Sequence, residues 1–274
     1  MLCNLRELIA MAEAQGHGLA AFNVYGYEDG KAVINAAERL NRPVVLMANK
    51  DAVHHMGVRM LAKILCTLAK EAAVPVGVHL DHATELPVIR EAIGEGFSSV
   101  MFDGSQLCYE QNTKLTKEVV HMAHEKGVSV EAEIGAVGYS DCSIKFQARY
   151  TEPEEARRFS EETGVDALAV AIGTVHRMEI QEANIQFDLL RKIHAEVNTP
   201  LVIHGSTGVA DSDLTKLIQY GATKINLGTT LRMAFGNTLR RQMEENPNEF
   251  DRVKMFGPCM KAVEEKACEK MNIL

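Results

Sequence analysis

The chain has 274 residues, 46% of them hydrophobic, and a formal net charge of −8 at pH 7. This is enough apolar material for one large barrel domain or two small domains, whereas an acidic chain without a Lys/Arg run is a poor match for nucleic acid or an anionic membrane. No apolar run reaches the roughly 18 residues of a membrane span, the N-terminus lacks signal-peptide features, and six scattered cysteines without a C-x-x-C pair predict reduced thiols in a cytoplasmic protein.

Short apolar runs alternate with longer amphipathic segments along the chain. Most of the runs are almost continuously apolar, as parallel strands are when they are covered on one face and packed inside on the other. We predict eight strands, at Ala20–Val24, Pro43–Ala48, Val74–Asp81, Ser99–Gly104, Val128–Gly135, Ala167–Ile172, Pro200–Gly205 and Lys224–Thr229. Their starts follow one another at intervals of roughly 23 to 39 residues, which leaves room for helices between them.

The segments between the strands carry helix signals. Helices are predicted over Asp29–Leu40, Thr84–Glu95, Asn112–Lys126 and Asp211–Gln219, with a further helix starting after Thr151. Apolar residues recur in them at helical spacing. Thr84 and Thr151 are the expected N-caps, and Gly221 suits the position just after a helix end.

Eight strands alternating with helices predict a (β/α)₈ barrel, the TIM-barrel fold, for which a length near 250 residues is typical. We expect one such α/β domain over residues 1–274 with a C-terminal helical extension. A doubly wound open sheet is the alternative. That fold would usually have a Gly-rich turn after its first strand, whereas the turn beginning at Asn23, Asn-Val-Tyr-Gly-Tyr, contains one glycine.

Three histidines lie at or just past predicted strands: His82 after the third, His176 after the sixth and His204 at the end of the seventh. The carboxyl ends of barrel strands meet on one rim, so these side chains are expected to lie together. Neutral imidazole suits zinc, and three protein ligands leave a fourth position open for a substrate. The carboxylates of Asp81 and Asp103 end the third and fourth strands at the same rim.

Glycine-rich and hydroxyl-rich turns follow the last two strands. They read His-Gly-Ser-Thr-Gly from His204 and Asn-Leu-Gly-Thr-Thr from Asn226. Loops after strands seven and eight of such barrels often bind phosphate through backbone N–H groups. The predicted substrate-binding residues here are Gly205, Ser206, Thr207, Asn226, Leu227, Gly228 and Thr229.

An open metal site beside a carboxylate and a phosphate pocket favours one kind of chemistry. The metal polarises a carbonyl as a Lewis acid, and the carboxylate moves a proton. This describes either aldol cleavage or isomerisation of a sugar phosphate, and the residues alone leave both open.

At these residues the chain resembles the class II, zinc-dependent ketose-bisphosphate aldolases, in particular the fructose- and tagatose-bisphosphate branch. The likeness runs from about Ala20 to the C-terminal helix. Its most specific motifs are His-Leu-Asp-His from His79, Ser-Val-Met-Phe-Asp-Gly-Ser from Ser99, Val-Glu-Ala-Glu-Ile-Gly from Val130, Gly-Val-Asp-Ala-Leu-Ala-Val-Ala-Ile-Gly-Thr-Val-His from Gly164, Leu-Val-Ile-His-Gly from Leu201 and Lys-Ile-Asn-Leu-Gly-Thr from Lys224.

The resemblance implies roles for these residues. Asp81 would be the general acid/base, and His82, His176 and His204 would bind Zn²⁺. Positions Asp103 and Glu133 match residues that lie near the metal in relatives and can bind a second cation. The turns after the last two strands would hold dihydroxyacetone phosphate, often with Na⁺ or K⁺ nearby. Family members are usually cytoplasmic homodimers or homotetramers.

The chain also departs from the family pattern. Arg177 follows His176 where the family usually has Gly, and Met47 and Asn49 replace the usual Gln and Ser after strand two. We therefore expect the triose-phosphate half of the substrate to be retained and the aldehyde half to differ. Further expected substrate-binding residues are Asn23, Asn49 and Arg177. The loop after strand five is short, and Asp141 is the nearest candidate for its catalytic acid.

Three other functions stay open. A lysine Schiff-base aldolase needs a desolvated Lys at a carboxyl strand end, whereas Lys224 lies at the start of its predicted strand. A metal-dependent sugar-phosphate isomerase or epimerase would use similar parts without releasing triose phosphate. A non-catalytic aldolase homologue would bind or assemble only.

Overall fold

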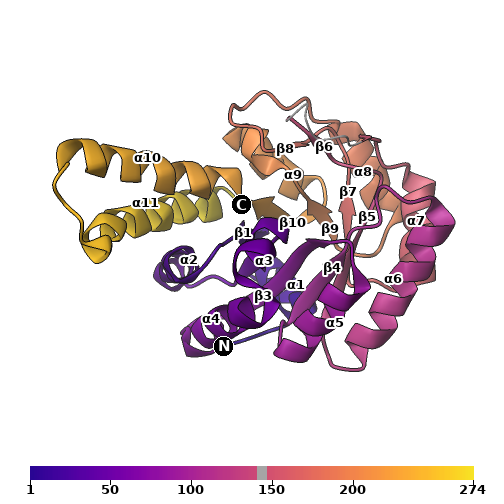
Figure 1. Ribbon diagram of the computed structural model, residues 1–274. Helices are drawn as coiled ribbons and strands as arrows, with labels where there is room; N and C mark the ends of the chain where they lie inside the picture. The colour runs from indigo at the N-terminus through magenta and orange to yellow at the C-terminus, as the bar shows by residue number, and fades with distance from the viewer. Residues whose placement is uncertain (141–146) are drawn as a thin grey trace.

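Eight parallel strands close into a barrel in the computed structural model, which describes residues 1–140 and 147–274 (Figure 1). The strands run around the barrel in the order β1-β10-β9-β7-β5-β4-β3-β2. They are β1 Leu19–Asn23, β2 Val44–Ala48, β3 Val76–Ala83, β4 Ser99–Phe102, β5 Ser129–Ile134, β7 Ala167–Val170, β9 Leu201–Ile203 and β10 Ala222–Leu227. The predicted TIM barrel is confirmed, with each predicted strand present and most of them shorter than predicted.

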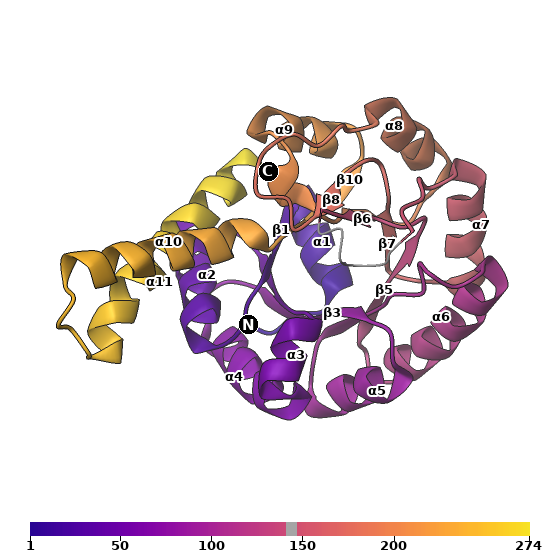
Figure 2. The ribbon, with the colours of Figure 1, turned by 45° about the horizontal axis from the view of Figure 1, so that its top comes forward.

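Helices form a ring outside the barrel, as the view into its mouth shows (Figure 2). They are α2 Tyr27–Leu40, α3 Lys50–Met56, α4 Val58–Glu71, α5 Leu86–Glu95, α6 Tyr109–His124, α7 Pro153–Thr163, α8 Phe187–Glu196 and α9 Asp211–Gln219. Outward-facing strand residues such as Val78 and Leu80 join apolar helix residues such as Leu65 in one buried cluster. This layer explains why the strand sequences read as continuous apolar runs.

Helix α1 (Leu5–Ala14) precedes the first strand and closes the amino-terminal end of the barrel. Its buried residues Leu5 and Leu8 pack with inward-facing barrel residues such as Val45 and Met101 in a second apolar cluster. The opposite end, where the strands finish, stays open to a pocket. The barrel thus has an apolar base and a polar mouth.

The end of β3 is irregular. Its register against β4 shifts between Leu80 and Ala83, because β3 has one extra residue there. His82 in this bulge has a φ of 53°, in the left-handed region that few non-glycine residues adopt. Side chains alternate between the two faces of a regular strand. The bulge interrupts the alternation, and the neighbours Asp81 and His82 both line the pocket at the barrel mouth.

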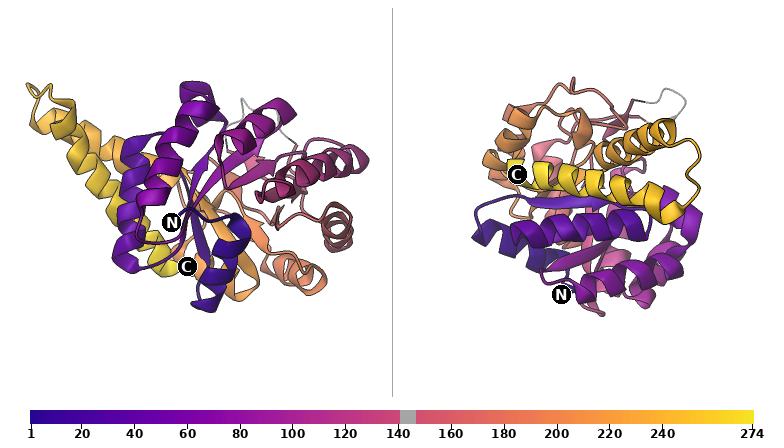
Figure 3. Two further views of the ribbon diagram at one scale, coloured as in Figure 1. Left: turned by 90° about the horizontal axis from the view of Figure 1, so that it is seen from below. Right: turned by 90° about the vertical axis from the view of Figure 1, so that its left-hand side faces the viewer.

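The chain ends in a helical hairpin, α10 (Thr229–Glu245) and α11 (Arg252–Ile273), which projects away from the barrel (Figure 3). Helix α11 packs against α2, and the far tip of the hairpin leaves Phe250 91% exposed and Val253 80% exposed. This hairpin is the C-terminal helical extension expected from the sequence. No helix among the described residues combines the length and apolar character needed to cross a membrane.

Two of the predicted helix caps are wrong. Helices α5 and α7 take Glu85 and Glu152 as their N-cap residues, without side-chain capping bonds. The Thr151 hydroxyl is instead buried between two strands, donating to the Ile134 carbonyl oxygen and accepting from the Ala171 N–H. Thr151 thus links the ends of β5 and β7. These buried hydrogen bonds stabilise the fold more than a capping hydrogen bond at the helix end, which water could replace.

Candidate metal centre and substrate pocket

Three imidazole rings converge at the mouth of the barrel. Their carriers are His82 in the β3 bulge, His204 directly after β9, and His176 in the two-residue strand β8 (Val175–His176), which pairs with β6 (Gly138–Tyr139). One nitrogen from each ring lies within 4.8 Å of the others. His82 Nε2 and His204 Nδ1 are only 2.7 Å apart. The sequence prediction that the three histidines lie together agrees with this geometry.

Carboxylates hold the outer nitrogens of two of these rings. His82 Nδ1 lies 2.8 Å from Asp103 Oδ2, and His204 Nε2 lies 2.9 Å from Glu131 Oε1. A ring N–H that donates to a carboxylate fixes the tautomer, so the other nitrogen presents its lone pair to the pocket. Histidine ligands of metal ions are commonly oriented in this way.

The charge state of the three rings depends on burial and on the nearby carboxylates. Burial lowers the pKa of His176 well below its usual value, and it also lowers the pKa of His204. Burial acts in the same direction on His82, but Asp81 and Asp103 outweigh it and raise the pKa of His82 to about 10. The cluster therefore holds a proton on His82 alone, and binding a metal ion to three neutral rings would release it.

A fully buried ion pair lies beneath the histidines inside the barrel. Lys224 Nζ lies 2.8 Å from Glu131 Oε2 and 2.7 Å from Asn226 Oδ1, and both charged side chains are 0% exposed. Burial alone would raise the pKa of Glu131, but Lys224 together with His204 and His79 outweighs burial and holds this pKa well below its usual value. Glu131 thus joins the lysine to the His204 ring. The inward-facing His79 lies beside it, with Nε2 3.9 Å from Glu131 Oε2.

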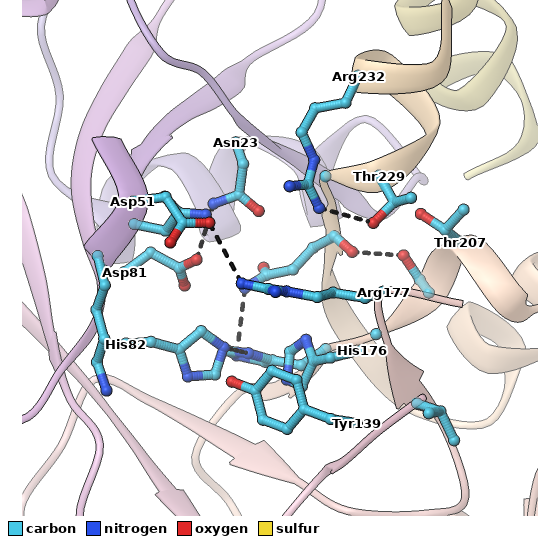
Figure 4. Close-up of a pocket in the computed structure, with 18 residues that line it drawn as sticks. Asn23, Asp51, Asp81, His82, Tyr139, His176, Arg177, Thr207, Thr229 and Arg232 are labelled. Carbon is cyan, nitrogen blue, oxygen red and sulfur yellow. Dashed lines mark hydrogen bonds and ion pairs between the residues drawn. The ribbon is translucent and has the colours of Figure 1, made fainter. Parts of the chain in front are cut away.

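Asp81 is buried at the edge of the histidine cluster (Figure 4). Asn23 Nδ2 donates to Asp81 Oδ2 at 2.8 Å, and Asp81 Oδ1 has no hydrogen-bond partner within residues 1–140 and 147–274. Burial raises the pKa of Asp81, but His82 and His204 outweigh burial and lower this pKa below its usual value. The carboxylate is therefore ionised near neutral pH and can accept a proton from a group in the pocket.

A second group of ligand-type atoms shares His82 with the first. Asp103 and Glu133 each offer a carboxylate oxygen, and these oxygens and a His82 nitrogen lie within 4.8 Å of one another. The Asp103 carboxylate also accepts from the Ser105 hydroxyl. Burial, assisted by Asp103, raises the pKa of Glu133 to about 8. Glu133 can thus hold a proton at neutral pH, or exchange it for a cation.

The loops after β9 and β10 build the opposite side of the pocket. Gly205 has a φ of 66°, and a Cβ at this position would lie 2.7 Å from the Val175 carbonyl carbon. Helix α10 begins at Thr229, and the first N–H groups of a helix have no partner within it. Arg232 Nη2 lies 3.1 Å from the Thr229 hydroxyl oxygen. A helix N-terminus beside a guanidinium group can bind a phosphate.

Arg177 and Tyr139 lie on the remaining side of the pocket. Arg177 has a φ of 59°, a left-handed conformation that costs a residue with a side chain about 1–2 kcal/mol. Its Nη2 atom lies 3.4 Å from Asp51 Oδ2. The Tyr139 ring stacks on His176, with centroids 4.9 Å apart. Burial, with help from Asp103, raises the pKa of Tyr139 to about 12, so its hydroxyl is protonated at neutral pH.

Most of the residues predicted for the site line one pocket: Asn23, Asn49, Asp81, His82, His176, Arg177, His204, Gly205, Ser206, Thr207, Asn226, Gly228 and Thr229. The Leu227 side chain does not, because it packs into the apolar cluster outside the barrel. Asn49 reaches the pocket while its side chain caps α3 through the Ala52 N–H. Asp141 lies outside the described residues.

Sequence reasoning missed five lining residues, namely Lys50, Asp51, Tyr139, Val175 and Arg232. Three of these occupy the first turn of a helix that follows a strand, in α3 or α10. That position was a usable signal, because the first turn after a barrel strand faces the mouth. Tyr139 belongs to a two-residue strand that has no sequence periodicity.

Comparisons with known proteins give a consistent result over the whole chain. A sequence model of the family described as fructose-bisphosphate aldolase class-II matches residues 3–274. A fructose-bisphosphate aldolase of Thermus caldophilus is 38% identical over 299 residues, covering 100% of this chain and 98% of that protein. A sulfofructosephosphate aldolase of Alkalicoccus urumqiensis is 35% identical over 271 residues, covering 98% and 94%. The crystal structure of the YdjI aldolase from Escherichia coli K12 is 33% identical, covers 100% of this chain and 97% of that chain, and superposes with a TM-score of 0.85.

Proposed function

Because the chain belongs to the class-II fructose-bisphosphate aldolase family, whose members are metal-dependent lyases, we propose that it reversibly cleaves a ketose phosphate into dihydroxyacetone phosphate and an aldehyde. The convergence of three imidazoles, one buried and two partly buried, beside the ionised Asp81 carboxylate carries this proposal. The two compared relatives are named for fructose bisphosphate and for sulfofructosephosphate, so their names leave the aldehyde half open.

The donor atoms suit a divalent metal ion. His82 Nε2 and His204 Nδ1 face each other while their outer nitrogens are held by Asp103 and Glu131, so both lone pairs are available to one ion. We propose that these two nitrogens and a nitrogen of His176 hold Zn²⁺, with Asp103 and Glu133 available to a second cation. When bound, the metal supplies a Lewis acid for the carbonyl of the triose half.

Asp81 performs the proton transfer in this proposal. In cleavage, its carboxylate takes the proton of the C4 hydroxyl, the C4–O group becomes the aldehyde carbonyl, and the C3–C4 bond breaks with its electron pair passing to the triose half. A second acid then protonates C3, a role we assign to Asp141. Asn23 keeps Asp81 in place through the 2.8 Å hydrogen bond to Oδ2, which leaves Oδ1 for the substrate hydroxyl.

The loops after β9 and β10 bind the phosphate of the triose half. The N-terminus of α10 and the Arg232 guanidinium provide positive charge there, and the Thr207 and Thr229 hydroxyls are further donors. We propose that Na⁺ or K⁺ binds beside this phosphate. We also propose that the protein is cytoplasmic and forms a homodimer or homotetramer. The exposed apolar residues Phe250 and Val253 on the projecting hairpin support the assembly.

A retro-aldol screen tests this function. A panel of ketose mono- and bisphosphates is incubated with the protein, and release of dihydroxyacetone phosphate is measured. We expect release from at least one ketose, and faster release from it than from fructose or tagatose bisphosphate. Interconversion of sugar phosphates without triose release would instead favour the isomerase or epimerase. If the purified protein contained no zinc and cleaved none of the ketose phosphates, the non-catalytic homologue would be favoured.

The carboxylate behind His204 is expected to tune metal affinity. Glu131→Gln keeps the shape of the side chain but removes its negative charge. That charge fixes the position of the His204 N–H and raises the basicity of the His204 ring. We expect the metal affinity to fall about 10- to 100-fold. Competition with a chromophoric chelator measures it.

Glu125→Gln is the matched control for this experiment, because Glu125 is an exposed glutamate on the outside of the barrel. A folded Glu131→Gln protein that binds the metal as tightly as the control would contradict the role of Glu131. The thermal transition of both variants is recorded, because the substitution also leaves Lys224 without its buried partner.

A further inference from the structure

Arg177 is held in a conformation that brings its side chain over the substrate pocket. It follows His176 directly, and its φ of 59° is one of three positive values among the described non-glycine residues. Figure 4 shows the guanidinium reaching across the pocket above the histidine rings toward Asp51. A strained backbone at a functional site suggests that the side chain direction serves the site.

The ion pair of Arg177 with Asp51 is weak. Its N···O distance is 3.4 Å, and the two side chains are 43% and 54% exposed. Exposed pairs of this kind contribute little, because water screens them and two flexible side chains must be ordered. The planar guanidinium has five N–H donors, and one contact leaves most of them available for an anion.

A second cavity adjoins the pocket at this position. Lys50, Tyr139 and Arg177 line both the main pocket and the neighbouring cavity, so they stand on the boundary between the two. Thr84, Phe102 and Asp103 also line this cavity, whereas Thr207 and Thr229 line the main pocket only. A substrate with its phosphate at the loops after β9 and β10 would direct its aldehyde half toward this boundary.

The charges on the boundary define the ligand. Lys50 and Arg177 each carry one positive charge, and Asp51, which lines the main pocket beside Arg177, carries one negative charge, which leaves a net charge of +1. The Asp103 carboxylate also lines the neighbouring cavity, but it is held against His82 at 2.8 Å. One negative charge on the substrate balances this set, whereas a phosphate dianion would leave an excess beside Asp51. We propose that Arg177, assisted by Lys50, forms a subsite for a single anionic group, a carboxylate or a sulfonate, at the end of the aldehyde half. This assignment rests on the aldolase function proposed above.

Condensation kinetics test the subsite. The enzyme joins dihydroxyacetone phosphate to four matched 2-hydroxyaldehydes that end in hydroxymethyl, carboxylate, sulfonate or phosphate. We expect kcat/KM for the carboxylate or the sulfonate to exceed that for the neutral aldehyde and for the phosphate by about 10- to 100-fold, the range of a charge-assisted hydrogen bond. Arg177→Gln removes this preference by raising KM for the charged aldehyde, and Arg177→Lys restores part of it.

Two controls separate the outcomes. Arg191→Gln removes an exposed arginine of α8 outside the pocket and keeps the preference. Exchange of dihydroxyacetone phosphate hydrogen with solvent, measured without aldehyde, reports the metal and triose half alone. Wild-type exchange without a charge preference overturns the subsite only, and absence of exchange overturns the aldolase function. A preference for phosphate, or loss of exchange in Arg177→Gln, also overturns the assignment.

Discussion

Removal of the metal is expected to lower the aldol cleavage rate at least roughly a thousandfold, because a Lewis acid contributes several kcal/mol of stabilisation to the charge that develops in the reaction. The three imidazoles without a metal cannot replace the Lewis acid, because their positive charge is the proton that Asp81 and Asp103 hold on His82. The measurement is the cleavage rate after dialysis against a chelator, followed by titration with Zn²⁺, Co²⁺ or Mn²⁺. Recovery at one ion per chain is the expected result.

A histidine variant supports the same test without a chelator. His204→Gln removes one of the three converging nitrogens, and it should reduce both bound metal and activity. His121→Gln is the matched control, because His121 is 78% exposed on the outside of α6. Full activity of chelated protein that contains no detectable metal would refute the assignment and would return attention to a lysine-based mechanism.

Replacing Asp81 with Asn should lower kcat for cleavage by about 10²- to 10⁴-fold, the usual contribution of a positioned acid or base. The amide has nearly the shape of the carboxylate and still accepts from Asn23, but it cannot take the proton of the C4 hydroxyl. Metal content should stay at the wild-type value, because Asp81 is not one of the three converging ligands. Steady-state cleavage and metal analysis on one preparation measure both quantities.

Hydrogen exchange sharpens this second experiment. In the proposed mechanism Asp81 acts on the hydroxyl of the aldehyde half, so Asp81→Asn should still exchange hydrogen between dihydroxyacetone phosphate and solvent. Asp188→Asn, at an aspartate that is 90% exposed, serves as the control. If Asp81→Asn lost both hydrogen exchange and cleavage, a role at the C4 hydroxyl would be contradicted. Asp81 would then act on the triose half or on the metal.

The sequence was sufficient for the barrel because most of the strands are almost continuously apolar runs. Val44–Ala48, for example, is buried along its whole length. The three histidines could be predicted to meet for a related reason, since parallel strands bring their carboxyl ends to one rim. This prediction required only the number and order of the strands, and no measured distance between the histidines.

The interior polar network was beyond that reasoning. Lys224 and Glu131 are charged residues inside strands, and such residues usually indicate a solvent-facing side. Their mutual contacts cancel the cost of burial, but the pairing depends on register across β5 and β10. Thr151 was misread for a similar reason, because a hydroxyl that caps helices equally well bridges two buried strands.

The bulge in β3 has a consequence for protein engineering. Because of the extra residue, one short segment presents the proposed proton-transfer group and a proposed metal ligand side by side, with the carboxylate and imidazole adjacent in the chain. A designer who grafted Asp81 and His82 onto a regular strand of another barrel would turn one of them outward into the helical layer. The transplantable unit is therefore the backbone irregularity, and insertion or deletion of a single residue beside it would separate the two functions.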